Sequence, residues 1–228
     1  MQRQSTRVNL SPYAFVLAGV MLAGLSPVLT KLLLLQNVAA EAVVAARYLL
    51  AVLLLAPIGL PNQRREDAPP PDRRAWVTLV LVGVLGSGLG ALLFVHALDL
   101  SSAGVVNSIS KTAPIFVALF AYFTLRERVT HLRFLLVVVM VSAVVLIGAG
   151  ELTFSSELVS TRLLGDALAL AAGMMRAGAE ILGKSALRRF RPTTVAMWRF
   201  GIGLAVTGVV AVATGGWGSL GGLSLRGW

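Results

Sequence analysis

Long runs of apolar residues fill most of the chain and are separated by short polar connections. A helix needs about 20 mostly apolar residues to cross the hydrocarbon core of a bilayer, and seven runs come close to that length. They are Tyr13–Leu34, Ala40–Ile58, Ala75–Leu98, Ser102–Thr124, Leu132–Ala149, Leu164–Lys184 and Thr194–Thr214. The pattern predicts an all-α, polytopic transmembrane helix bundle of about seven helices.

Composition supports a lipid environment. Hydrophobic residues make up 57% of the 228 residues and charged residues 13%, about half the charged fraction of a soluble domain. The mean hydropathy is +0.82. We therefore expect the lipid bilayer to surround most of the chain.

The basic residues gather in alternate connections. Of 20 Lys and Arg, 13 lie on one side if the N-terminus is cytoplasmic, and only Arg162 and Arg226 lie on the other. Loops rich in Lys and Arg stay cytoplasmic during insertion, so the pattern predicts a multi-pass cell-membrane protein with a cytoplasmic N-terminus. The net charge of +10 then meets anionic headgroups, and no nucleic-acid partner is expected.

The chain contains a second passage that resembles an earlier one. Lys31 aligns with Lys184 and Arg47 with Arg199, and an aromatic residue follows the Arg in both copies. Because five crossings separate the copies, the second copy runs through the membrane upside down. Inverted repeats of this kind are typical of secondary transporters. We predict a first five-helix repeat over 1–150 and the start of a second repeat over 163–228, which has two helices and is incomplete.

Several motifs resemble a known family. The segment Phe94–Gly104 contains an aromatic-x-x-Ala-Leu helix end and a Ser-Ala turn; Lys111–Leu119 contains a Pro-aromatic pair, and Leu125–Arg128 a Glu-Arg exit. Arg47 and Leu164-Gly165-Asp166 also match. In these motifs the chain resembles EamA-type members of the drug/metabolite transporter superfamily. The resemblance implies a ten-helix secondary transporter that exports a small polar metabolite by alternating access.

Lys111 is the most informative charged residue within a predicted crossing. It lies beside Asn107 and Ser110, and Pro114 leaves the Ser110 carbonyl without its helical N–H partner. Charges at the bilayer centre cost about 2.5–3.5 kcal/mol and usually serve a function. An interrupted helix of this kind can form a substrate site, so we predict that Lys111, Asn107 and Ser110 bind substrate. The alternative is a structural kink whose Lys pairs with a carboxylate.

The sixth crossing carries Arg176, Glu180 and Lys184 on one face, at spacings of four residues. Glu180 either neutralises Arg176 or takes up a proton that drives transport. Arg47 lies too deep to reach the headgroups easily, and with Arg199 it is expected to bracket a central cavity that attracts anions. Packing against backbone carbonyls is an equally good interpretation. Arg47, Arg176 and Glu180 complete the predicted substrate-binding set, and Lys31 is expected to reach the outer interface.

The excess of Lys and Arg over Glu in the crossings favours an amino acid or organic anion as the small-molecule substrate. The chain has no Cys, and its two His are far apart in sequence, so no metal and no cofactor are predicted. An enzyme is disfavoured because no nucleophile and base are paired at membrane depth. One alternative remains open: a truncated, non-transporting membrane fragment that needs a homodimer or another partner chain to complete the second repeat.

Overall fold

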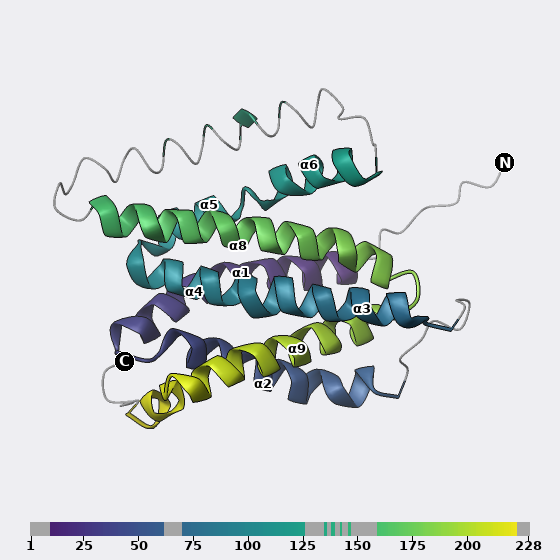
Figure 1. Ribbon diagram of the computed structural model, residues 1–228, viewed down its shortest axis with the longest axis horizontal. Helices are drawn as coiled ribbons and strands as arrows, with labels where there is room; N and C mark the ends of the chain where they lie inside the picture. The colour runs from purple at the N-terminus through teal and green to yellow at the C-terminus, as the bar shows by residue number, and fades with distance from the viewer. Residues whose placement is uncertain are drawn as a thin grey trace.

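The computed structural model describes residues 10–61, 70–125 and 159–222, together with five single positions between residues 135 and 146. The described part is helical and contains no strand, as predicted. Its elements (Figure 1) are α1 (Leu10–Leu35), α2 (Ala40–Gly59), α3 (Arg73–Val82), η1 (Gly83–Leu89), α4 (Gly90–Leu100), α5 (Ala103–Ser110), α6 (Ala113–Leu125), α8 (Val159–Ala186), α9 (Pro192–Ala213) and η2 (Gly216–Gly222).

Five helical stretches of the described chain are long and apolar enough to cross a bilayer. They are Leu17–Leu35, Ala40–Gly59, Arg73–Leu100, Ala103–Phe120 and Pro192–Ala213, and they coincide with the first four and the seventh of the predicted crossings. The prediction of an all-α polytopic bundle is therefore confirmed. The fifth predicted crossing, Leu132–Ala149, lies outside the described residues apart from the single positions.

Helix α8 covers the sixth predicted crossing but is not among the five stretches that are apolar enough to cross a bilayer. It carries five charged residues between Arg162 and Lys184, so its sequence is less apolar than those of the other crossings. It also contacts α3, η1, α4, α5 and α6, and Figure 1 shows it between the α3–α4 pair and the α5–α6 pair. This packing leaves Arg162, Asp166 and Arg176 half-buried against neighbouring helices, while Glu180 and Lys184 remain exposed.

The third predicted crossing is not one regular helix. Residues Gly83–Leu89 form a π-helical segment, η1, between α3 and α4. Glycines in this segment allow close helix contact: a Cβ at Gly83 would lie 2.6 Å from Cβ of Ile202, and one at Gly86 would lie 2.8 Å from Cβ of Ala179. π-Helical turns often occur at functional sites, and this one places Ser87 at the cavity described below.

The fourth crossing is interrupted at Lys111 and Thr112, between α5 and α6. The Lys111 amide donates to the carbonyls of Asn107 and Ser108 at 3.1 Å, so α5 ends in a tightened turn. Pro114 has no N–H to offer to the Ser110 carbonyl. The interruption predicted from Pro114 is therefore confirmed.

Helices α8 and α9 run opposite to α1 and α2 in Figure 1, as an inverted repeat requires. Helix α9 lies along α2, and the aromatic residues that follow the paired arginines meet there: the ring centroids of Tyr48 and Phe200 are 5.4 Å apart. The division into a complete and an incomplete repeat stays a prediction.

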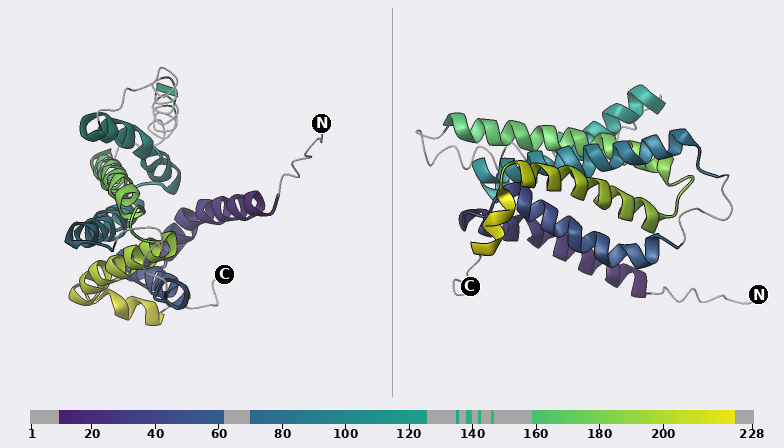
Figure 2. Two further views of the ribbon diagram at one scale, coloured as in Figure 1. Left: turned by 90° about the vertical axis from the view of Figure 1, so that its right-hand side faces the viewer. Right: turned by 60° about the horizontal axis from the view of Figure 1, so that its bottom comes forward.

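Helix α1 stands away from the other helices along much of its length (Figure 2). Its large apolar side chains, from Leu17 to Leu35, are largely exposed, which suits contact with lipid. Lys31 anchors its C-terminal end: the Lys31 ammonium donates to the carbonyl oxygens of Leu98, Asp99 and Ser101. Lys31 therefore caps the carbonyls at the end of α4, a contact to protein where we expected only the interface.

Candidate functional site

A cavity of about 430 Å³ lies between α1, α2, η1, α4, α5, α8 and α9. That volume is within the usual range for small-molecule sites. Residues from both predicted repeats line it, because α8 and α9 contribute Arg176, Arg199 and Phe200. The interface between repeats is where secondary transporters bind their substrates.

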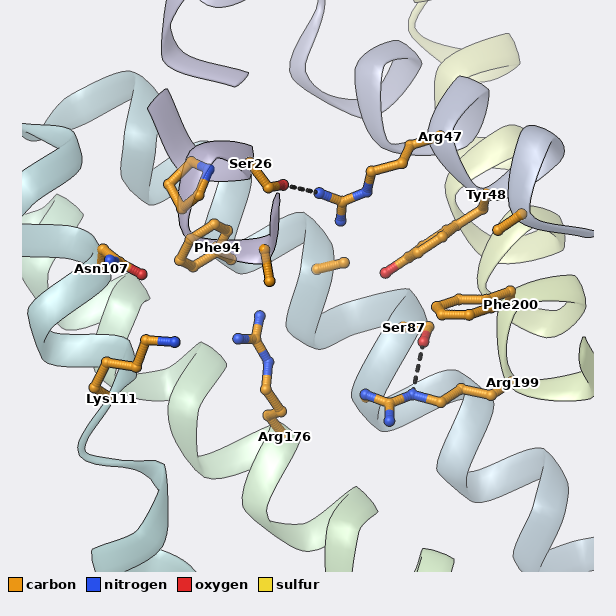
Figure 3. A pocket seen from close by; sticks show the side chains of 15 residues that line it. Ser26, Arg47, Tyr48, Ser87, Phe94, Asn107, Lys111, Arg176, Arg199 and Phe200 are labelled. Carbon is orange, nitrogen blue, oxygen red and sulfur yellow. Dashed lines mark hydrogen bonds between the residues drawn. The ribbon is translucent and has the colours of Figure 1, made fainter. Parts of the chain in front are cut away.

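Four cationic side chains line the cavity, and each comes from a different part of the bundle. Arg47 belongs to α2, Lys111 to the α5–α6 interruption, Arg176 to α8 and Arg199 to α9. Figure 3 shows Lys111, Arg176 and Arg47 pointing toward the centre from three sides. None of the described residues that line the cavity is acidic, so the cavity carries a strong positive potential.

Two of the arginines are held by serine hydroxyls. The Arg47 Nη1 donates to Oγ of Ser26 at 3.0 Å, and the Arg199 Nε donates to Oγ of Ser87 at 3.0 Å. A hydroxyl orients a guanidinium group but leaves its charge uncompensated. The two arginines are thus fixed in direction and remain electrostatically available to a ligand.

Aromatic rings form the apolar part of the wall. The Arg176 guanidinium carbon lies 5.2 Å from the centroid of the Phe94 ring, in cation–π distance. Tyr48 is buried at 5% exposure and packs on Phe200, while Arg47 lies 5.5 Å from the Tyr48 ring. The rings limit the conformations of the arginines without neutralising them.

The structure brings together four of the six predicted site residues. Arg47, Asn107, Lys111 and Arg176 line the same cavity, although they are far apart in sequence. Arg47 and Lys111 are exposed, and Arg176 is half-buried. These positions agree with a shared binding role, which stays a prediction.

The other two predicted residues lie elsewhere. The buried Ser110 hydroxyl donates to the Val106 carbonyl at 2.8 Å, within its own helix. Glu180 is exposed, one turn along α8 from Arg176, and does not line the cavity. Neither residue is placed to touch a ligand in the cavity.

Sequence reasoning missed most of the uncharged lining, although it included Asn107. Ser26 and Ser87 lack any local signal, since serines are common in apolar helices, whereas Phe94 was noted only as the aromatic residue of a helix-end motif. Tyr48 and Phe200 did have a signal in the sequence, because each follows one of the two repeat-related arginines.

A second polar contact joins α2 and α9 outside the cavity. Glu41 is buried at 7% exposure, and its Oε1 accepts a hydrogen bond from the Thr214 hydroxyl. Beside it, the Ala39 amide donates to Oγ of Ser219 at 2.9 Å. These bonds tie the start of α2 to the end of α9 and to η2.

A bundle of membrane-crossing helices with a cavity between predicted repeats is the architecture expected of a secondary transporter. Residues 10–149, more than half of the chain, match the EamA-like transporter family, and the chain belongs to this family. No curated protein and no solved structure matches the chain. The protein is therefore a multi-pass membrane transporter of the EamA type, which implies a lipid environment and a small-molecule substrate. The family consists of transporters, which argues against an enzymatic role.

Proposed function

We propose that the protein exports a small polar metabolite with an acidic group, such as an amino acid or an organic anion, across the cell membrane by alternating access. The observation that carries this proposal is the cavity lined by Arg47, Lys111, Arg176 and Arg199, with no acidic side chain among the lining residues that the structure describes. A site of that charge selects for negative groups.

The size of the electrostatic effect supports an anionic cargo. At an effective dielectric constant of about 20, two unit charges roughly 5 Å apart interact by about 3 kcal/mol. An acidic group at the centre of the cavity gains such a contribution from several cations, less its own desolvation cost. A cationic metabolite would meet repulsion of the same size from each.

The irregular helices at the cavity provide the positions at which the proposed conformational change would take place. The crossing through Lys111 is interrupted, the crossing through Ser87 contains a π-helical segment, and α1 contains Pro27 beside Ser26. All of these irregularities border the cavity. A break in a helix allows one half to rotate against the other, so these positions are suited to open the cavity alternately to each side.

The proposal is tested by efflux from cells that overproduce the chain. Cells are loaded with a panel of labelled amino acids and organic acids, and loss of label is followed with time. We expect faster efflux of at least one anionic metabolite. Lys111→Ala should abolish the increase while membrane insertion is retained, because it removes a cation that borders the site.

Arg188→Ala is the matched control, because Arg188 is an exposed cation beyond the end of α8 and does not line the cavity. It should transport like the unchanged chain. Equal efflux from the Lys111→Ala cells would remove Lys111 from the site. Absence of efflux for every metabolite of the panel would argue against the transport proposal itself.

A second candidate is a chain that works only with a partner, either a second copy or another protein. The exposure of Arg47 and Lys111 favours it, because a partner would close the open side of the cavity. Light scattering of the purified protein in detergent gives its mass. Transport by vesicles that contain only monomers would exclude this alternative.

A further inference from the structure

The positive charge of the cavity exceeds what one acidic group can balance. Four cations line it, and none of its lining residues in the described part of the chain is acidic. Glu180, which is exposed outside the cavity, also acts electrostatically on Arg176. Counting Glu180 against the four cations leaves three positive charges, so a ligand with a single negative charge leaves the site strongly positive.

The cations are also arranged so that together they can bind the oxygen atoms of one acidic ligand. Lys111, Arg176 and Arg47 point to a common centre from three different helical segments (Figure 3). Guanidinium groups bind carboxylate and phosphate oxygens through paired N–H groups. Because Arg47 is already oriented by Ser26, less freedom is lost when it binds such a group.

The same lining is unfavourable for the ammonium group of a zwitterion. The oxygen atoms that line the cavity belong to neutral side chains and backbone, among them Ser26, Tyr48, Ser87 and Asn107. An ammonium group placed there would face several cations with only neutral acceptors. The carboxylate of an ordinary amino acid therefore favours binding in the cavity, and its ammonium group opposes binding.

The cavity volume limits the size of the ligand. A volume of about 430 Å³ is near the lower end of the range of small-molecule sites, about 300–1,000 Å³. A compact organic molecule with two acidic charges fits within that limit.

We propose that the cavity selects small organic dianions, either dicarboxylates or phosphomonoesters, over monoanions and zwitterions. This inference rests on the proposed function and specifies its substrate class. Its basis is the convergence on one cavity of at least three cations (Figure 3), with no acidic side chain among the described lining residues.

The test compares ligands that differ in charge and little else. The full chain, purified in detergent, is titrated calorimetrically with succinate, monomethyl succinate and 4-aminobutanoate at constant ionic strength. Methyl phosphate and dimethyl phosphate form the phosphate arm, at about pH 8, above the second phosphate pKa of about 6. We expect at least one dianion to bind about tenfold more tightly than its monoanionic partner, a difference of about 1.4 kcal/mol, and more tightly than 4-aminobutanoate.

Variants then assign that preference to the cavity. Lys111→Gln and Arg176→Gln should each reduce dianion affinity several-fold and reduce the difference between dianion and monoanion. Lys111→Arg retains the charge and should retain the preference, which separates loss of charge from loss of folding. Arg188→Gln, the exposed control, should bind like the unchanged chain.

Equal binding of each dianion and its monoanion, or tighter binding of 4-aminobutanoate, would overturn the inference, as would absence of binding by every probe. The efflux experiment remains separate from this result. Lys111-dependent export of a zwitterionic amino acid would keep the proposed function and reject the dianion class. Dianion binding without any export would reject the transport proposal and leave the charge selection as a property of the cavity.

Discussion

Gly203 in α9 is a position where a single added methyl group should disturb the packing of the bundle. A Cβ built at Gly203 would lie 2.6 Å from Cβ of Ser87 and 3.0 Å from Cε2 of Tyr48. Ordinary contact begins at 3.4 Å, so relief requires a shift of about 0.8 Å (3.4 − 2.6). The Ser87 Cβ is attached directly to the backbone of η1, and therefore η1 and α9 must move apart.

The expected change in the free energy of unfolding of Gly203→Ala follows from two opposing effects. Overpacking a close contact costs about 1–3 kcal/mol, and replacing Gly by Ala in a helix returns about 1 kcal/mol. Gly201 and Gly208 lie in the same helix and have nothing within 4 Å of an added Cβ. Gly201→Ala and Gly208→Ala should therefore raise the free energy of unfolding through helix propensity, with no overpacking cost. We expect Gly203→Ala to be less stable than either control by about 1–3 kcal/mol.

Equilibrium unfolding in mixed micelles with increasing dodecyl sulfate, followed by tryptophan fluorescence, measures the three free energies of unfolding. Trp198 in the same helix provides a local signal. Gly203→Ala should also reduce efflux, because the shift would disturb the Arg199–Ser87 hydrogen bond at the cavity. If Gly203→Ala unfolded at the same detergent fraction as Gly201→Ala, the close packing of α9 on η1 would be refuted.

Three further predictions concern the ends of the helices. Lys31→Met removes a charged donor from the carbonyls at the end of α4 and should lower the free energy of unfolding by about 1.5–3 kcal/mol, whereas Lys31→Arg should restore part of it in the same assay. Thr214→Val leaves the buried Glu41 carboxylate without its hydroxyl partner and should cost about 1–3 kcal/mol; a stability equal to that of Thr214→Ser would contradict this. A reporter enzyme inserted after Arg74 should be active only on the cytoplasmic side, and periplasmic or external activity would reverse the proposed orientation.

The sequence alone was enough for the helical architecture and for five of the crossings within the described residues. A bilayer has a set thickness, so the length and apolarity of Ala40–Ile58 or Thr194–Thr214 already identify a spanning helix. The interruption near Lys111 was equally predictable, since the missing N–H of Pro114 is a covalent property of the chain. Such features depend on residues within one or two turns.

The lining of the cavity depended on how the helices are rotated against one another. Arg176 and Glu180 are four residues apart and differ by about 40° around a helix of 3.6 residues per turn, so periodicity places them on one face. The packing of α8 directs Arg176 over Phe94 into the cavity and leaves Glu180 exposed.

Contacts between distant segments needed the tertiary structure for the same reason. The partners of Lys31 are backbone carbonyls 67 to 70 residues further along the chain, and a carbonyl carries no signal in a sequence. Ser87 reaches Arg199 only because the glycines of η1 allow α9 to approach. The sequence determined which segments enter the membrane and which of them carry charge, and the packing decided which of those charges meet.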